Sequence, residues 1–156
     1  MNLKAISPVI ATVIIVSVAI AIAVAVAFWM TGITGLFTRY EKLEIVSAYA
    51  TAQAGGGWTV TLIVRNTGTT DVTIDNIFIN GIPYNTLEGA NAFSDLKADG
   101  DTVSEPLSIA LKPGDSKTIT FDLTSEGTYK FTSGQVVEVK LHTAAGNEYP
   151  KSVQLP

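Results

Sequence analysis

An unbroken apolar stretch lies near the start of the chain: residues 8–30 read PVIATVIIVSVAIAIAVAVAFWM, with Thr12 and Ser17 as the only polar side chains. No charged residue occurs between Lys4 and Arg39. As an α-helix the stretch would be about 34 Å long, enough to cross a hydrocarbon layer of about 30 Å. The sequence therefore predicts a helix that must be hidden from water.

The alternation of alanine with branched residues from Val18 to Ala27 is also typical of a β-strand. The stretch is too long for one strand, and a lone strand in lipid would leave its backbone groups unpaired. A helix is therefore favoured, with Pro8 in its first turn, where proline removes no hydrogen bond. Gly32 and Gly35 can loosen or end this helix.

Alanines recur along the predicted helix and give it small-residue faces. We expect one face to carry Ala11, Ala19, Ala23 and Ala27, and an adjacent face to carry Ala21 and Ala25. Small residues at four-residue spacing let neighbouring helices approach closely. Hydropathy alone does not separate this interpretation from a plain membrane anchor without partners.

Composition excludes several classes of function. The formal net charge is −4 with a sequence pI near 4.8, and the acidic residues are scattered, so we expect no direct binding of nucleic acid. Cysteine is absent, which excludes disulfides and thiolate metal sites. The apolar stretch exceeds the 7 to 15 residues typical of a signal peptide and lacks a clear small-residue cleavage site after it, so we expect it to be retained.

After residue 42 the pattern changes to short alternating segments separated by turn residues. Trp58, Val60, Leu62 and Val64 fall on one face of a half-buried strand. The Asn80-Gly81 pair is a strong hairpin signal. Seven strands are predicted, at residues 43–49, 58–65, 72–79, 107–111, 118–123, 136–141 and 149–155. This count suits a two-sheet, immunoglobulin-like sandwich and gives an α+β fold class overall.

The segment at residues 86–106 is less regular, and we interpret it as a long loop or short edge strands on the outer surface. Threonines on the predicted outward faces reflect β-propensity or, alternatively, a hydroxyl-rich coat for glycosylation or adhesive contacts. These threonines are Thr59, Thr61, Thr73, Thr118 and Thr120.

No catalytic, cofactor or metal constellation emerges. His142 is the only histidine, and the sequence supplies no partner for general-base chemistry. Asp95, Asp99 and Asp101 surround Gly100, but their spacing does not fit an EF-hand, so turn chemistry is favoured over Ca²⁺ binding. We expect neither an enzyme nor a bound cofactor.

The amino-terminal residues carry a resemblance to a known family. Lys4-Ala5 followed by ISPVIATVI at residues 6–14 resembles the amino terminus of archaeal type IV pilins. The match covers about the first thirty residues. Archaellins share the same plan, but their amino termini generally differ from ISPVIATVI, so a pilus is preferred over a motility filament.

The resemblance implies processing and assembly. A membrane prepilin peptidase would cut between Ala5 and Ile6, after the basic Lys4, so that residues 1–5 form a leader. Residues 6–40 would form a helix that lies first in the membrane and then, as a homopolymer, in a filament core. An assembly ATPase and a membrane platform protein are the implied partners. Residues 41–156 would form the exposed sandwich of an extracellular pilus used in surface adhesion.

Two alternatives remain open from the sequence. The chain could be a single-span membrane protein that displays an immunoglobulin-like binding domain. It could also be the pilin of a DNA-uptake or cell-contact system, although an acidic chain without a basic groove makes direct DNA binding less attractive.

Overall fold

The computed structural model describes residues 7–125 and 127–156, and the chain divides into two compact units, Met1–Arg39 and Tyr40–Pro156. The described part of the first unit forms the helix α1 (Pro8–Phe37). Pro8 lies in its first turn, and the Ser7 carbonyl accepts hydrogen bonds from Ile10 N (3.0 Å) and Ala11 N (3.2 Å). Gly32 and Gly35 lie inside the helix and do not end it.

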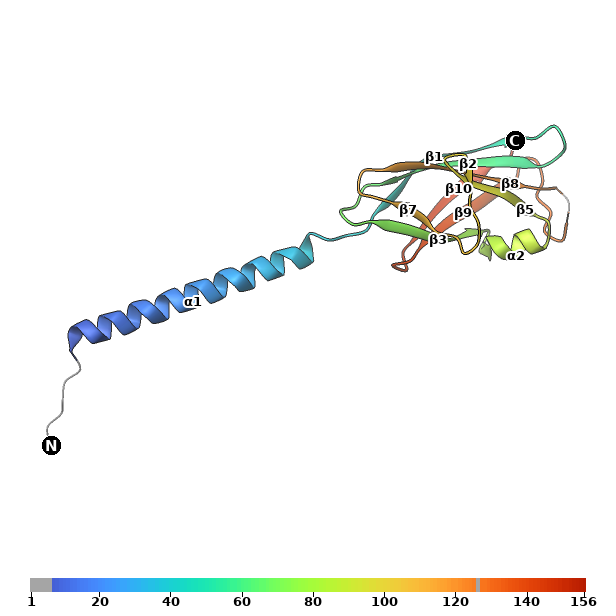
Figure 1. Cartoon of the computed structure of the whole chain (residues 1–156). Coiled ribbons are helices and arrows are strands. Elements are labelled where there is room, and N and C mark those ends of the chain that lie inside the picture. Colours follow the sequence, from blue (N-terminus) through green and yellow to red (C-terminus); the bar gives the residue numbers. More distant parts are fainter. Residues whose placement is uncertain (1–6, 126) are drawn as a thin grey trace. The chain divides into compact units, whose positions relative to one another are not determined.

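The second unit is here called the head, and its described residues form ten strands and one short helix (Figure 1). The elements are β1 (Leu43–Ala52), β2 (Trp58–Asn66), β3 (Val72–Ile79), β4 (Ile82–Pro83), α2 (Tyr84–Gly89), β5 (Phe93–Ala98), β6 (Asp101–Thr102), β7 (Ile109–Leu111), β8 (Ser116–Leu123), β9 (Val136–Thr143) and β10 (Glu148–Gln154).

The strands form two antiparallel sheets. One sheet has the order β1-β2-β8-β5-β6, and the other has the order β10-β9-β3-β4, with β7 also paired to β3. The seven strands of six or more residues divide four and three between the sheets, in the arrangement of an immunoglobulin constant domain. The predicted α+β fold, a long apolar helix followed by an immunoglobulin-like sandwich, is confirmed.

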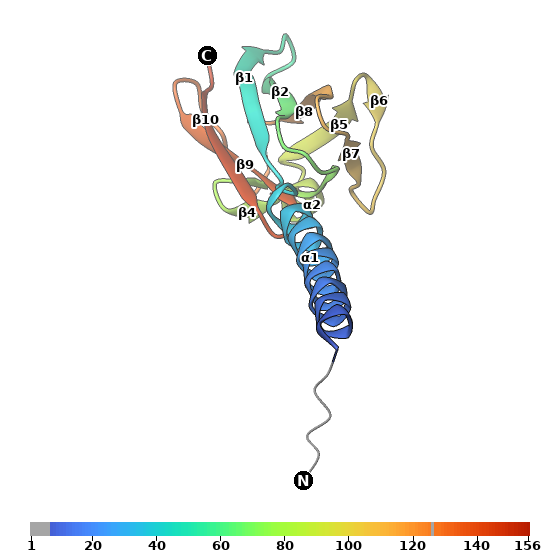
Figure 2. The same cartoon turned by 90° about the vertical axis from the view of Figure 1, so that its left-hand side faces the viewer.

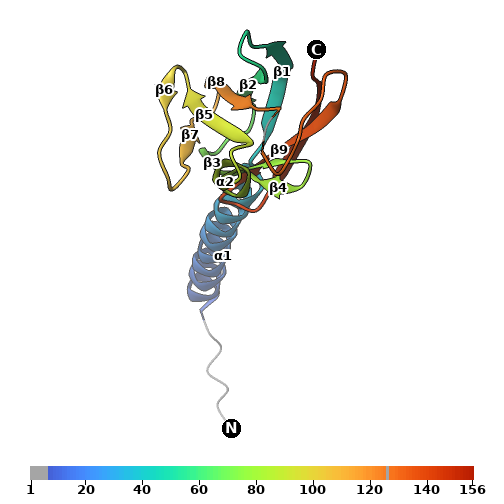
Figure 3. The same ribbon diagram turned by 90° about the vertical axis from the view of Figure 1, so that its right-hand side faces the viewer.

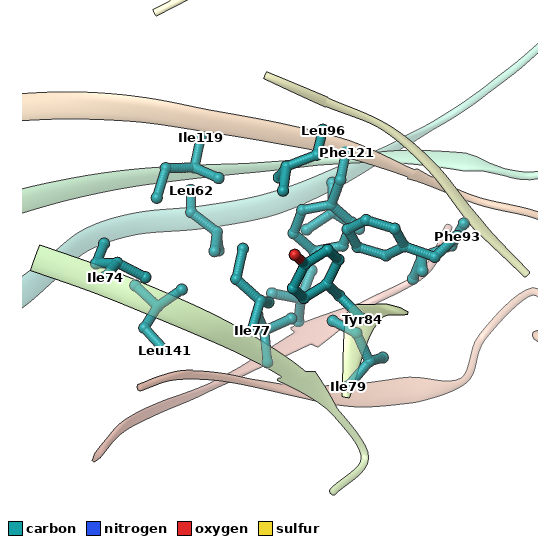
Figure 4. Packing of buried hydrophobic residues seen from close by; sticks show 14 of the residues in the cluster. Leu62, Ile74, Ile77, Ile79, Tyr84, Phe93, Leu96, Ile119, Phe121 and Leu141 are labelled. Atoms are coloured by element: carbon teal, nitrogen blue, oxygen red, sulfur yellow. The ribbon is translucent and has the colours of Figure 1, made fainter. Parts of the chain in front are cut away.

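The inner faces of the two sheets supply the core of the head (Figure 4). Val60, Leu62 and Val64 are fully buried and Trp58 nearly so, as their alternation along β2 predicts. The ring of Phe121 stacks on Phe93 with centroids 4.9 Å apart. The head therefore buries its apolar surface within itself.

The segment at residues 86–106 is more ordered than the sequence indicates. Short edge strands are present, since β5 pairs with β8 and β6 forms the edge of that sheet. An outer-surface location is wrong for part of this segment, because Leu87, Phe93 and Leu96 are buried in the core. The strand expected at 107–111 is shortened to Ile109–Leu111.

Two hairpin turns use residues with positive φ. Asn80 (φ 50°) and Gly81 (φ 79°) connect β3 to β4, which confirms the predicted Asn-Gly turn. Asp99 (φ 54°) and Gly100 (φ 91°) connect β5 to β6 in the same way. The acidic loop is therefore built as a turn.

Candidate functional site

The surface of α1 is the first candidate site because it is almost entirely apolar and uncovered. Residues Pro8–Gly35 have a mean hydropathy of 3.1 and qualify by length and composition as a membrane span. The exposed large apolar side chains of α1 range from 48% exposed at Val24 to 76% exposed at Phe28. Among the described side chains of this helix none is buried. So much contiguous apolar surface indicates contact with lipid or protein.

The hydroxyl groups of α1 donate hydrogen bonds to its own backbone, a feature that the sequence pattern does not reveal. Thr12 Oγ1 donates to the Val9 carbonyl (2.8 Å) and Ser17 Oγ to the Val13 carbonyl (2.7 Å). Thr34 Oγ1 donates to the Met30 carbonyl (2.8 Å), and Thr31 bonds the Ala27 carbonyl in the same manner. Hydroxyls bonded one turn back do not need a partner from water, so the helix suits an apolar environment.

The alanines of α1 form two rows. At about 100° per residue, Ala19, Ala23 and Ala27 lie within roughly 80° of one another. Ala21 and Ala25 lie roughly 160° from Ala23, so the expectation of an adjacent face is wrong and they occupy the opposite side.

Ala11 is set roughly 80° from Ala19 and roughly 160° from Ala27, and it is partly exposed. It therefore borders the row of Ala19, Ala23 and Ala27 and does not continue it. Rows of branched residues separate the two alanine rows. These rows contain Val18, Ile22 and Val26 on one side and Ile20 and Val24 on the other.

The expected processing residues Lys4, Ala5 and Ile6 lie outside the described residues. The described chain begins beside them, at Ser7 and the first turn of α1. Cleavage between Ala5 and Ile6 stays a prediction.

The neck of the head, residues 40–42, is fixed by the turn at residues 66–70. Thr69 N donates to the Tyr40 carbonyl (3.0 Å), and Thr67 N donates to the Lys42 carbonyl (2.9 Å). A Cβ on Gly68 would lie 2.6 Å from both Lys42 N and the Tyr40 carbonyl oxygen, so only glycine fits. The head therefore holds its first residues firmly.

The turn of the neck is organised by the buried side chain of Asn66. Its Nδ2 donates to the carbonyls of Thr70 (2.8 Å) and Leu111 (3.0 Å), and its Oδ1 accepts from Gly68 N (2.9 Å). Both amide hydrogens donate and the amide oxygen accepts, so the nitrogen and the oxygen of this buried side chain each have backbone partners.

The structure supplies His142 with a partner that the sequence did not reveal. Asp75 Oδ1 lies 2.6 Å from His142 Nδ1, because β3 and β9 are neighbours and Asp75 lies at a register shift, next to Asn76, which pairs with His142. Phe78 contacts the imidazole edge-on at 6.3 Å between ring centroids. No serine, threonine or cysteine hydroxyl or thiol is hydrogen-bonded to this pair in the described chain, so it lacks the nucleophile of a hydrolytic triad.

The acidic loop forms contacts within the head. Asp99 Oδ1 accepts a hydrogen bond from Thr118 N (2.8 Å), and Asp95 forms an ion pair with Lys97 at 2.8 Å. Across residues 7–125 and 127–156, no group of three or more His, Asp or Glu side chains is arranged to hold a metal ion. Turn chemistry accounts for these carboxylates.

Comparison with known proteins shows similarity at the level of structure only. No protein-family model matches the chain, and no curated protein matches its sequence. The archaellum periplasmic stator protein FlaG from Sulfolobus acidocaldarius is 22% identical, over 72% of this chain and 99% of that one, with a TM-score of 0.44. A subunit of the archaeal flagellum of Methanospirillum hungatei strain JF1 is 15% identical, over 94% and 88%, with a TM-score of 0.45.

A third similar structure is the apo PCuAC domain from PmoF1, at 14% identity over 75% of this chain and 98% of that one, with a TM-score of 0.47. Similar structures thus include archaeal filament and stator proteins, and also a domain from another context. All three TM-scores lie below 0.5, so these similarities carry no conclusion about function.

Proposed function

We propose that this chain is the structural subunit of an archaeal type IV pilus. The observation that supports the proposal is α1, a helix of 30 residues with an uncovered apolar surface and hydroxyls bonded internally. Such a helix is equally suited to lipid and to a bundle of identical helices. Residues 4–14 resemble the amino terminus of archaeal type IV pilins, and this resemblance implies that the helix moves from the membrane into the filament.

The two alanine rows support a polymer over a pair of helices. Because the rows lie on nearly opposite sides of α1, each helix has a shallow groove on two sides and branched ridges between them. Ridges of one helix pack into grooves of the next, and small residues shorten the distance between axes. A helix with two such sides can contact a neighbour on each, which a closed dimer does not need.

Assembly by this route requires outside work. Lipid chains are as apolar as the helix, so transfer from bilayer to filament core gains little from the hydrophobic effect and depends on packing. We therefore propose that a prepilin peptidase releases Ile6 as the new amino terminus by cutting after Lys4-Ala5. An assembly ATPase and a membrane platform protein then drive extraction, and the head is carried on the outside of the extracellular filament for surface adhesion.

The decisive experiment is to purify surface filaments from cells that express the full chain. We expect this chain as the dominant species, with a terminal peptide that starts at Ile6 in mass spectrometry. Recovery only as a detergent-extracted monomer that retains Met1 would support the single-span anchor and contradict the polymer.

A pair of variants tests the alanine row. Ala23→Leu adds bulk in the centre of the row and should reduce filament yield while the head stays folded. Ile20→Leu introduces the same side chain on a branched ridge with almost no change in volume, so it should leave filament yield unchanged. Normal filaments from Ala23→Leu would contradict close packing at that face.

A further inference from the structure

Helix α1 is longer than the hydrocarbon layer of a bilayer requires. It is continuous over its 30 residues, as Figures 2 and 3 show, and at about 1.5 Å per residue it is about 45 Å long. The hydrocarbon layer is about 30 Å thick and takes about 20 residues of an upright helix. Because residues 8–35 all qualify as a span, hydropathy alone does not determine which twenty lie in the lipid.

Tilting the helix does not remove the excess length. To place all 30 residues within the hydrocarbon, the axis of α1 would have to tilt by about 50° from the bilayer normal. Transmembrane helices tilt by about 20° on average and by about 40° at most. At a tilt of about 20° the hydrocarbon takes about 21 residues, so part of α1 lies outside the lipid chains.

One polar group of α1 indicates which end lies outside. Among the described side chains of residues 8–35, every hydroxyl donates a hydrogen bond to a carbonyl of the helix itself. The indole Nε1 of Trp29 has no hydrogen-bond partner in the described chain, and its side chain is 68% exposed. An N–H group without a partner is costly in hydrocarbon, so Trp29 needs an acceptor from outside the helix.

The headgroup layer of a bilayer supplies the acceptors that Trp29 lacks. Phosphate oxygens and water accept the indole N–H there, while the apolar part of the ring packs on the first carbons of the lipid chains. The hydrocarbon interior offers no acceptor, so an exposed indole is more stable at the boundary than in the interior. Tryptophan is accordingly enriched at this level of membrane proteins.

The length and composition of α1 agree with a boundary at Trp29. Counted back from Trp29, a layer of about 30 Å has its middle near residue 19 and its other boundary near residue 9. The helix begins at Pro8, so its first turn reaches that other boundary. Residues 30–37 contain two threonines and two glycines, whereas residues 9–28 contain no glycine and only two hydroxyls. The segment richer in hydroxyls and glycines thus lies outside the lipid chains.

We infer that Trp29 binds the headgroup layer on the carboxyl-terminal side of the span, so that residues 9–28 lie in the hydrocarbon and residues 30–37 lie beyond it. The inference rests on the membrane stage of the proposed function. Residues 30–37 are then the part of α1 that other proteins can reach before the helix leaves the lipid. The competing placement centres α1 in the bilayer, which puts the indole about 5 Å inside the hydrocarbon without an acceptor.

Fluorescence quenching of the full chain in lipid vesicles measures the depth of Trp29. Because Trp29 and Trp58 are the two tryptophans, Trp58→Phe leaves Trp29 as the reporter. We expect lipids brominated near the headgroup to quench Trp29 severalfold more than lipids brominated near the chain ends. The control carries Ile20→Trp with both tryptophans replaced by phenylalanine, and it should show the reverse order. If Trp58→Phe unfolds the head, subtracting the signal of Trp29→Phe from that of the wild type gives the same quantity.

A second measurement uses the absence of cysteine from the chain. Thr31→Cys and Ser17→Cys are a matched pair, because each replaces a hydroxyl that donates to a carbonyl one turn back. In lipid nanodiscs, where both faces of the bilayer are open to the reagent, a membrane-impermeant maleimide should label Thr31→Cys and not Ser17→Cys. Both variants should react in detergent.

Stronger quenching of Trp29 from the chain ends than from the headgroups, or no labelling of Thr31→Cys in nanodiscs, would overturn the inference. If filaments form but Trp29 lies deep in the hydrocarbon, this inference fails and the pilus role stands. If Trp29 lies at the headgroups but no filaments form, the pilus role fails and this placement of α1 stands.

Discussion

Apolar side chains are exposed on helix α1 and buried in the head. In the head, Val60, Leu62 and Phe121 are fully buried between two sheets of the same chain. In α1, Ile22 and Val26 are at least half exposed, and no described side chain is buried. The head therefore has the burial that a stable domain needs, whereas α1 leaves an exposed apolar surface, which is typical of contact with lipid or protein.

The polar groups show the same contrast. The hydroxyls of Thr12 and Ser17 donate hydrogen bonds to carbonyls of their own helix, so they need no hydrogen-bond partner outside α1. Asn66 in the head instead connects three separate backbone positions, at Gly68, Thr70 and Leu111. Because the hydrogen bonds of α1 lie within the helix, its lipid neighbours can be replaced by protein neighbours without breaking any hydrogen bond. The hydrogen bonds of Asn66 instead hold the backbone of the head in one arrangement.

The largest effect is expected from a charge placed in α1. Ile22→Lys puts an ammonium group in the middle of the helix, at a cost of about 3 kcal/mol for membrane insertion alone. We expect filaments to be lost, as counted by electron microscopy. Val46→Lys is the control, because Val46 on β1 is 57% exposed and Ile22 is 58% exposed. Filaments of normal number from Ile22→Lys would show that α1 is not buried in the assembly.

A second pair of variants compares two phenylalanines. Phe121→Ala removes a fully buried ring stacked on Phe93, and we expect the head to lose about 3 to 5 kcal/mol of stability. Phe28→Ala removes a ring that is 76% exposed on α1 and should leave the head unchanged. Hydrogen exchange of the β-strands, measured on the full chain in nanodiscs, reports both. If the β-strands of the two variants were equally protected from hydrogen exchange, the head would not have a core that is independent of α1.

A third pair concerns the neck. Gly68→Ala forces a Cβ to within 2.6 Å of Lys42 N and the Tyr40 carbonyl oxygen, so the turn or the neck must move. We expect a loss of about 1 to 3 kcal/mol and faster hydrogen exchange at Thr67 and Thr69, typical of overpacking. Gly89→Ala is the control, since a Cβ there meets no atom within 4 Å. Unchanged exchange in Gly68→Ala would show that the neck is not fixed by this turn.

Periodicity and composition were sufficient for the architecture. The uncharged stretch predicts α1, and alternation along β2 predicts which side chains are buried, because each signal is local and repeated. The segment at residues 86–106 was only partly predicted. Phe93 is buried in the core because β5 pairs with β8, and the six residues of β5 show no regular alternation from which this pairing could be predicted.

Sites made by distant residues were missed for the same reason. Asp75 and His142 meet only because β3 and β9 are neighbours. The alanine rows of α1 were half predicted, since the row of Ala19, Ala23 and Ala27 follows from spacing but the position of Ala21 and Ala25 needed the full helical rotation. Processing at Ala5 and Ile6 rests on resemblance alone.

The smallest expected effect is a loss of stability at high pH that occurs in the head and not in α1. Burial, followed by the hydrogen bond to Glu105, raises the pKa of Tyr84 above 10.0, and burial likewise raises the pKa of Tyr149. The unfolded chain therefore loses these protons first, and the stability that they contribute is present below pH 10 and declines as the pH rises above it. Lys97, whose pKa is raised above 10.5 by its hydrogen bond to Asp95, acts in the same direction.

Between Lys4 and Arg39 there is no ionisable side chain, and the α-amino group that cleavage would create at Ile6 is already largely neutral above about pH 9. Contacts through α1 should therefore not respond to a change above that pH. We expect the head to be less protected from hydrogen exchange, after correction for the intrinsic rate, at about pH 10.5 than at about pH 9.5, while filaments stay intact by electron microscopy. Tyr84→Phe should flatten the pH response of the head. Filaments that dissociate over the same range, in step with the head, would mean that the heads and not the helices hold the polymer together.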